Sequence, residues 1–100
     1  MQRNFDTILK DFDGNPIVDG GRELTLKLVS VNALMVPYPD ESTLTGDEKM
    51  SRYLLAQRIH PGGVIELRVE EVAQLKALIG KAYGPIVVGP AFQILEAVNA

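Results

Sequence analysis

The chain has 100 residues, 46% of them hydrophobic and 23% charged, so we expect one folded domain over residues 1–100 rather than two domains or a disordered tail. Ten Lys and Arg against thirteen Asp and Glu give a net charge of −3, which leaves no basic surplus to neutralise a row of nucleic-acid phosphates. The lack of cysteine excludes disulfide bonds, thiolate metal sites and cysteine nucleophiles, and it fits a cytoplasmic protein. The most apolar stretch is too short to span a bilayer, so a membrane is not an expected partner.

The first segment has the composition of a β-hairpin. Strand-forming residues fill 5–10, and an Asp-Gly pair at Asp13 and Gly14 permits the positive φ angles of a tight turn. Pro16 prevents a helix, and Ile17 and Val18 would form the returning strand. The sequence therefore predicts a hairpin over residues 5–18.

The segment from Glu23 to Val36 has two interpretations. Leucines alternate with polar residues at its start, which is the period of a strand, whereas the later apolar residues share one helical face. The Thr25 hydroxyl is suited to cap a helix that begins at the next residue. We favour a short strand at 23–25 followed by a helix to about Met35, with a strand throughout as the alternative.

A helix is expected from Thr45 to about His60. Thr45 and Glu48 have the spacing of a capping box, in which each side chain bonds the backbone N–H of the other residue. Glu48 and Arg52 stand four residues apart in the favourable order for an ion pair. The glycines at 62–63 follow a proline and end the helix. They stand after a helix and before a strand, whereas the glycines of a phosphate-binding loop stand after a strand and before a helix, so we expect a turn here.

The C-terminal third has a strand and two helices. Residues 64–67 form a short β-type run, and 70–83 have one apolar arc at helical spacing. A Gly-Pro pair ends that helix, and Pro90 at a first helical position starts the last helix, 91–98. Residues 86–88 are expected to form a linking turn or a brief strand.

These elements predict an α+β domain. Its small antiparallel sheet would consist of the hairpin 5–18 and the strand 64–67, packed against three or four helices. A domain of this size can bury a modest core unaided.

One loop has partial calcium-binding spacing. Asp11, Asp13 and Asn15 occupy the first three ligand offsets of a helix-loop-helix calcium site. Such a site also needs a glycine and a distal carboxylate, where this chain has Pro16 and Arg22. A hairpin turn is therefore the favoured interpretation, and no metal ligand is predicted.

The remaining polar residues form no recognisable catalytic set. His60 is the only histidine, and its place at a helix C-terminus is explained by the helix dipole. Glu66, Glu70 and Glu71 could supply paired carboxylates, but acids in a first helical turn are typical of helix stabilisation. We therefore expect no catalytic residue and no cofactor, and we do not expect an enzyme.

The helix at 47–60 has two apolar stripes instead of one. Met50, Tyr53 and Leu54 form the first, while Leu55 and Ile59 form the second on nearly the opposite side. A surface helix needs only one such face, so the helix is either enclosed within the domain or meets a partner through its second stripe. Tyr38, between two prolines in a loop, adds an aromatic of the kind that anchors interfaces. The candidate interface residues are therefore Leu55, Ile59 and Tyr38.

Several strings of the sequence resemble those of a known group of proteins. They are Gly14-Asn15-Pro16-Ile17, Leu24-Thr25-Leu26, Asn32-Ala33-Leu34, Gly46-Asp47-Glu48-Lys49, Arg52-Tyr53-Leu54-Leu55-Ala56, Ile65-Glu66-Leu67 and Leu75-Lys76-Ala77-Leu78-Ile79. In these the chain resembles short uncharacterised proteins of tailed bacteriophages and prophages. The resemblance implies a phage or prophage origin, and a role in assembly or in handling a host component. It supplies no catalytic residues.

Two functions follow as expectations. The first is a non-enzymatic phage protein in the cytoplasm of a bacterial host, with an assembly or accessory role exerted through protein–protein contacts, including contacts with a second copy of itself. The second is a small acidic regulator or inhibitor that docks on a host enzyme or nucleic-acid complex. The second rests on the first fifty residues, which carry five basic and nine acidic side chains.

Overall fold

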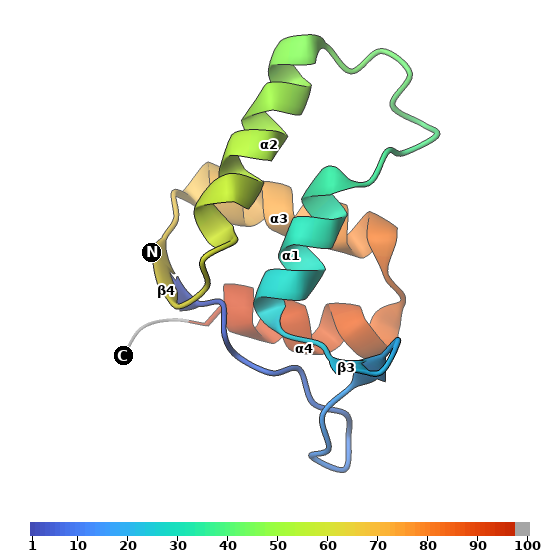
Figure 1. The fold of residues 1–100 in the computed structure, drawn as a ribbon, viewed down its shortest axis with the longest axis vertical. Helices are drawn as coiled ribbons and strands as arrows, with labels where there is room; N and C mark the ends of the chain where they lie inside the picture. Colours follow the sequence, from blue (N-terminus) through green and yellow to red (C-terminus); the bar gives the residue numbers. More distant parts are fainter. Residues whose placement is uncertain (98–100) are drawn as a thin grey trace.

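The computed structural model describes residues 1–97, which form four helices and two two-stranded antiparallel sheets (Figure 1). The helices are α1 (Leu26–Met35), α2 (Gly46–Ile59), α3 (Val69–Ala82) and α4 (Pro85–Leu95). The strands are β1 (Gln2–Asn4), β2 (Val18–Asp19), β3 (Arg22–Glu23) and β4 (Val64–Glu66). The predicted α+β class is thereby confirmed.

Helix α1 lies at the centre of the fold. It packs against α2 and α3, and α3 in turn packs against α4 (Figure 1). The core draws on every helix and on the segments around the short strands. Its fully buried large apolar side chains are Phe5, Leu9, Leu26, Val29, Ile59, Leu67, Leu75, Ile79 and Leu95.

The sheets differ from the predicted single sheet. The strand at 64–66 pairs with β1, which the sequence analysis did not identify, in a register that places Arg3 opposite Ile65. Within 5–18 the turn is present, since Asp11 N–H donates to Asn15 O at 2.8 Å, but the pairing is reduced to one bridge between Lys10 and Pro16. The ladder does not extend further because Val18 pairs with Glu23 and Ile8 with Thr25 instead.

The segment after β3 forms a helix, which is the favoured of the two interpretations. The Thr25 hydroxyl accepts a hydrogen bond from Leu28 N–H at 3.2 Å, which confirms the predicted cap. Val29, Ala33 and Leu34 are buried along α1. The alternative of a strand throughout is wrong, because the α1 side chains bury themselves at helical spacing against both α2 and α3.

Helix α2 begins as expected, but one predicted ion pair is wrong. Glu48 N–H donates to the Thr45 hydroxyl at 3.1 Å, while the Glu48 carboxylate accepts from that hydroxyl rather than from the backbone. Arg52 pairs with Glu41 instead of Glu48. The Glu41 carboxylate meets the Arg52 guanidinium with two parallel hydrogen bonds, a geometry that is more favourable than an exposed pair along one helix.

The last helix begins earlier than predicted. It starts at Pro85, with Gly84 as its N-cap, and Pro90 lies inside it rather than at its start. The core explains the difference: Val87, Ala91 and Leu95 are all buried, and their spacing of four residues requires one continuous helix. The part of the predicted helix beyond residue 97 lies outside the described residues.

The turn between α2 and β4 depends on a glycine. Gly62 has a φ of 78°, and a Cβ atom on it would collide with the carboxylate of Asp6. The next residue, Gly63, accepts a backbone hydrogen bond from Phe5 N–H at 2.9 Å. The turn therefore joins the end of α2 to the N-terminal segment, and it fixes where the C-terminal half of α2 lies.

Candidate interaction surface

Two of the three predicted interface residues lie in the core. Leu55 is 4% exposed and Ile59 is 0% exposed, because the face of α2 that carries them packs inside the domain. They therefore cannot present a surface to a partner. The prediction that Leu55 and Ile59 meet a partner is therefore wrong, and their stripe of α2 is enclosed within the domain.

The third residue, Tyr38, anchors the loop between α1 and α2. Its hydroxyl donates to Ala33 O at 2.6 Å and lies 3.2 Å from Leu78 O. Its ring lies 5.9 Å from the Arg52 guanidinium carbon and 5.1 Å from Lys81 Nζ, both within cation–π range. Burial raises the pKa of the Tyr38 hydroxyl. Tyr38 is thus a partly buried structural residue and not an exposed aromatic anchor.

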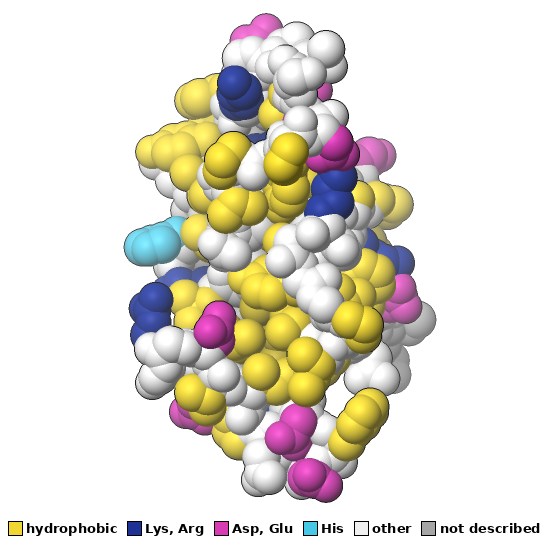
Figure 2. Space-filling model, turned by 90° about the vertical axis from the view of Figure 1, so that its right-hand side faces the viewer, with side chains coloured by type: hydrophobic (Ala, Val, Ile, Leu, Met, Phe, Trp, Pro, Cys, Tyr) yellow, Lys and Arg dark blue, Asp and Glu magenta, His cyan; other side chains and the backbone are white. Residues whose placement is uncertain are grey.

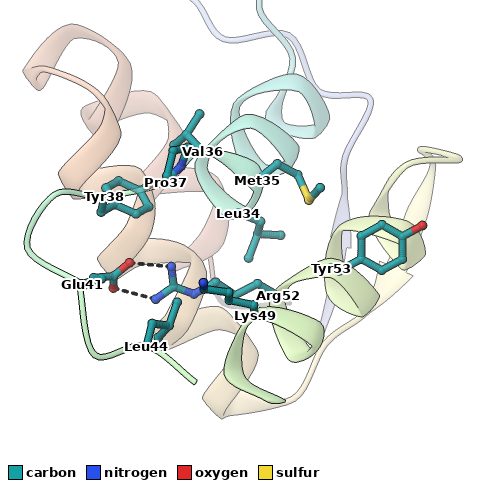
Figure 3. A pocket seen from close by; sticks show the side chains of 10 residues that line it. All are labelled: Leu34, Met35, Val36, Pro37, Tyr38, Glu41, Leu44, Lys49, Arg52 and Tyr53. Atoms are coloured by element: carbon teal, nitrogen blue, oxygen red, sulfur yellow. Dashed lines mark hydrogen bonds and ion pairs between the residues drawn. The ribbon is translucent and has the colours of Figure 1, made fainter. Parts of the chain in front are cut away.

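The same loop is held by four charged side chains around Tyr38, and the five residues are here called the Glu41 cluster: Tyr38, Asp40, Glu41, Arg52 and Lys81. The two Glu41 oxygens accept from Arg52 Nη1 and Nη2 at 2.7 and 2.6 Å (Figure 3). Lys81 lies 3.2 Å from the Glu41 carboxylate and 3.0 Å from that of Asp40. The hydrogen bonds from Arg52, with a smaller effect of Lys81, lower the pKa of Glu41 to about 2. The cluster therefore joins the loop to α2 and α3.

A pocket of about 450 Å³ opens beside the Glu41 cluster (Figure 3). Apolar side chains supply most of its wall, among them Leu34, Met35 and Tyr53, and its charged groups include Glu41 and Arg52. Both oxygens of Glu41 are occupied by hydrogen bonds from Arg52, and its lowered pKa opposes protonation near neutral pH. Within the described part of the chain, this pocket thus pairs an apolar wall with a carboxylate that is poorly suited to act as a general base.

The other stripe of α2 is the exposed one. The outer stripe of α2, defined as Met50, Tyr53 and Leu54, has exposed fractions of 51%, 46% and 49%. At about 100° per residue these side chains point away from the core face that carries Leu55 and Ile59. Both stripes are evident in the sequence, but their hydrophobicity alone does not say which of them faces inward, so the sequence placed the exposed face on the stripe that the structure buries.

A groove runs beside this stripe, between α1 and α2. The α1–α2 groove has a volume of about 280 Å³ and is lined by Val31, Met35, Tyr53, Ala56, Gln57 and His60. Met35, at the end of α1, is 50% exposed. Figure 2 shows hydrophobic side chains exposed in the upper part and across the middle of one face of the molecule, with charged side chains between and around them. The outer stripe and the groove share Tyr53 and together form an apolar surface with a concave side.

The opposite flank of the stripe carries two arginines. Leu54 also borders a second depression, which Arg58 and Arg68 line from α2 and from the start of α3. Glu71 accepts from Arg58 at 2.7 and 3.0 Å and from the backbone N–H of Arg68 at 2.9 Å. The Arg58 hydrogen bonds lower the pKa of Glu71, which is nearly buried. The side chains of Arg58 and Arg68 remain 48% and 76% exposed.

The residues considered for chemistry have structural roles. Asp11 Oδ1 accepts from the backbone N–H groups of Asp13 and Asn15, at 2.9 and 3.0 Å, so this carboxylate shapes the turn. His60 is the exposed C-cap of α2, at the helix end where the sequence placed it. Within residues 1–97, no group of three or more His, Asp or Glu side chains is placed to hold a metal ion.

Neither family models nor the curated proteins and solved structures that were compared with the chain give a match. The resemblance to phage proteins therefore stays a prediction. In the described part of the chain, no helix has both the length and the apolar character needed to cross a bilayer.

Proposed function

We propose that this protein acts by binding another protein through the outer stripe of α2 and the adjoining α1–α2 groove. The observation that carries the proposal is the pair of apolar faces on α2: one is buried, and the other leaves Met50, Tyr53 and Leu54 about half exposed. Contiguous apolar patches of this kind are typical of interaction sites, whereas single exposed apolar residues are ordinary. Tyrosine and methionine are also enriched in the centres of protein interfaces.

The charged side chains favour a binding role over a catalytic one. Glu41 and Glu71 are each held by an arginine with two hydrogen bonds, and both have lowered pKa values. A general acid or base that works near neutral pH needs a pKa near that pH, which is the opposite shift for a carboxyl group. We therefore propose a non-enzymatic role, and the resemblance to phage proteins suggests an assembly or accessory role in the cytoplasm of a bacterial host.

A co-purification experiment with matched variants tests this function. The tagged chain, its Leu54→Glu variant and an Ile86→Glu control would be expressed in infected or lysogenic bacteria. Leu54 lies in the outer stripe, while Ile86 is 62% exposed on α4 and so is a comparable apolar residue elsewhere. We expect the wild type and the control to retain the same protein, either a second copy of the chain or a different protein, and Leu54→Glu to lose it. Equal retention by all three, or retention of no protein by the wild type, contradicts the proposal.

The tip of the first turn favours the second function, a small regulator that docks on a host complex. Phe12 is fully exposed and stands between Asp11 and Asp13, on a turn held by the two hydrogen bonds to Asp11 Oδ1. An aromatic side chain between two acids would suit an apolar pocket with a basic rim. Association through this tip would weaken with added salt and on Phe12→Ala, but not on Leu54→Glu, because exposed charges are screened within about 8 Å at physiological ionic strength.

A further inference from the structure

We propose that the outer stripe of α2 binds a second copy of this chain, with the two α2 helices packed antiparallel across a two-fold axis near Tyr53 and Leu54. This inference rests on the proposed function, because it uses the same apolar surface and names its partner. Most soluble oligomers are symmetric dimers, in which one patch must complement itself. The evidence is the distribution of apolar and charged side chains along α2.

The apolar side chains are self-complementary in this arrangement. Tyr53 and Leu54 lie at the midpoint between Asp47 and His60, so an axis there places Leu54 against Leu54 of the second copy. The same register places Met50 of the second copy opposite Gln57, three residues beyond Leu54. Gln57 lines the α1–α2 groove, which offers an apolar recess beside that contact. Methionine is flexible and fits irregular recesses of this kind.

The charges select the antiparallel direction. The first turn of α2 carries Asp47 and Glu48, and its last turn carries Arg58. Asp47, Leu54 and Arg58 lie on the same flank of the outer stripe at about 100° per residue. A two-fold axis perpendicular to the helices keeps this flank facing itself, so Asp47 of the second copy approaches Arg58 and the exposed Arg68 beside it. The helix dipoles are also antiparallel in this arrangement, which favours it over a parallel pair.

The size of the surface indicates a weak dimer. Helix α2 has 14 residues and is therefore about 21 Å long, with the groove on one side and the arginines on the other. Interfaces that bury less than about 1,200 Å² in total are characteristic of transient contacts. We therefore place the dissociation constant in the micromolar range, so the association depends on protein concentration.

Sedimentation equilibrium over a wide range of micromolar concentrations tests the dimer. The mass of the wild type should rise from the monomer value of 10.9 kDa toward twice that value. Leu54→Glu should raise the dissociation constant at least tenfold, because it brings two carboxylates together at the axis, and Ile86→Glu should dimerise like the wild type. Far-UV circular dichroism checks that the variants are folded. A wild type that stays monomeric at several hundred micromolar, or a Leu54→Glu variant that dimerises normally, overturns the proposal.

Cysteine cross-linking tests the direction, since the chain has no cysteine of its own. Under mild oxidation Leu54→Cys should cross-link to itself. Met50→Cys and Gln57→Cys should cross-link when mixed but only slowly when each is alone. Efficient self-cross-linking of Met50→Cys would indicate parallel helices and contradict the proposed arrangement.

The contribution of charged side chains to the proposed dimer can be measured separately. Asp47→Lys should raise the dissociation constant about fivefold through the two symmetric contacts, and the difference from the wild type should shrink in high salt. An unchanged constant would exclude the predicted contact between Asp47 and Arg58. A strictly monomeric wild type that still retains a different protein in a Leu54-dependent way would refute the dimer and leave the proposed function intact.

Discussion

Two adjacent leucines provide the sharpest test of how α2 sits in the fold. Leu54 is 49% exposed in the outer stripe, whereas Leu55 is 4% exposed in the core. The two variants Leu54→Ala and Leu55→Ala remove the same atoms from neighbouring positions of one helix. Alanine also favours the helix at both positions, so the difference between the variants reports on packing.

The structure sets the expected magnitudes. Leu55→Ala removes buried methyl and methylene groups and leaves a cavity, which costs about 2–5 kcal/mol of unfolding free energy. Leu54→Ala removes the same groups from a half-exposed position. At about 0.8 kcal/mol per fully buried CH₂, we expect a loss of about 1 kcal/mol or less, with no cavity contribution.

Urea unfolding followed by far-UV circular dichroism measures both changes, at a low concentration where the proposed dimer is dissociated. The two midpoints are comparable if the slope of the unfolding free energy against urea is unchanged. Equal losses for the two variants, or a larger loss for Leu54→Ala, would refute the assignment of the inward face. The outer stripe would then no longer be available to a partner, and both proposals built on it would fail.

Three further predictions concern the interior and the turns. Glu41→Gln should lower the free energy of unfolding near neutral pH, and this loss should disappear as the pH falls. The reason is that the pKa of Glu41 is about 2 in the fold against 4.5 unfolded, so the stabilisation by its carboxylate is present above about pH 5 and is lost toward pH 2. A loss that persists unchanged down to pH 2 would contradict this. Gly62→Ala and Gly63→Ala should each cost about 1–2 kcal/mol, because both glycines have a positive φ and the exposed Asp6 side chain beside Gly62 can turn away from an added Cβ; unchanged midpoints in urea would contradict the positive φ angles. Ser30→Ala should leave thermal stability unchanged or raise it, because the buried Ser30 hydroxyl has no hydrogen-bond partner among the described residues; a marked drop in melting temperature would show that the hydroxyl is satisfied.

Local features of the fold could be predicted from the sequence. The caps at Thr25 and Thr45 and the turn at Asp11 depend on contacts within three or four residues, so a short stretch of sequence contains both partners. The apolar arc of α3 was equally clear, and Val72, Leu75, Leu78 and Ile79 are all buried. The caps, the turn and the apolar arc of this helix could therefore be predicted without knowledge of the tertiary structure.

The candidate site was only half predictable. The sequence showed that α2 has two apolar stripes, but their hydrophobicities are too similar to rank. The decision came from packing, because Leu55 and Ile59 join a core shared with α1 and α3 while the side chains of the outer stripe stay about half exposed. Leu55 and Ile59, which the sequence suggested as interface residues, are therefore part of the core.

By itself the sequence determined the fold class, the helix caps and the two-faced character of α2, since each follows from residue types at short separations. Only the tertiary structure decided the partner of β4, the pairing of Arg52 with Glu41 instead of Glu48, and the inward face of α2. The physical reason is common to all three. Each is a competition between alternatives that are similar in local energy, and contacts between segments distant in the chain select one of them.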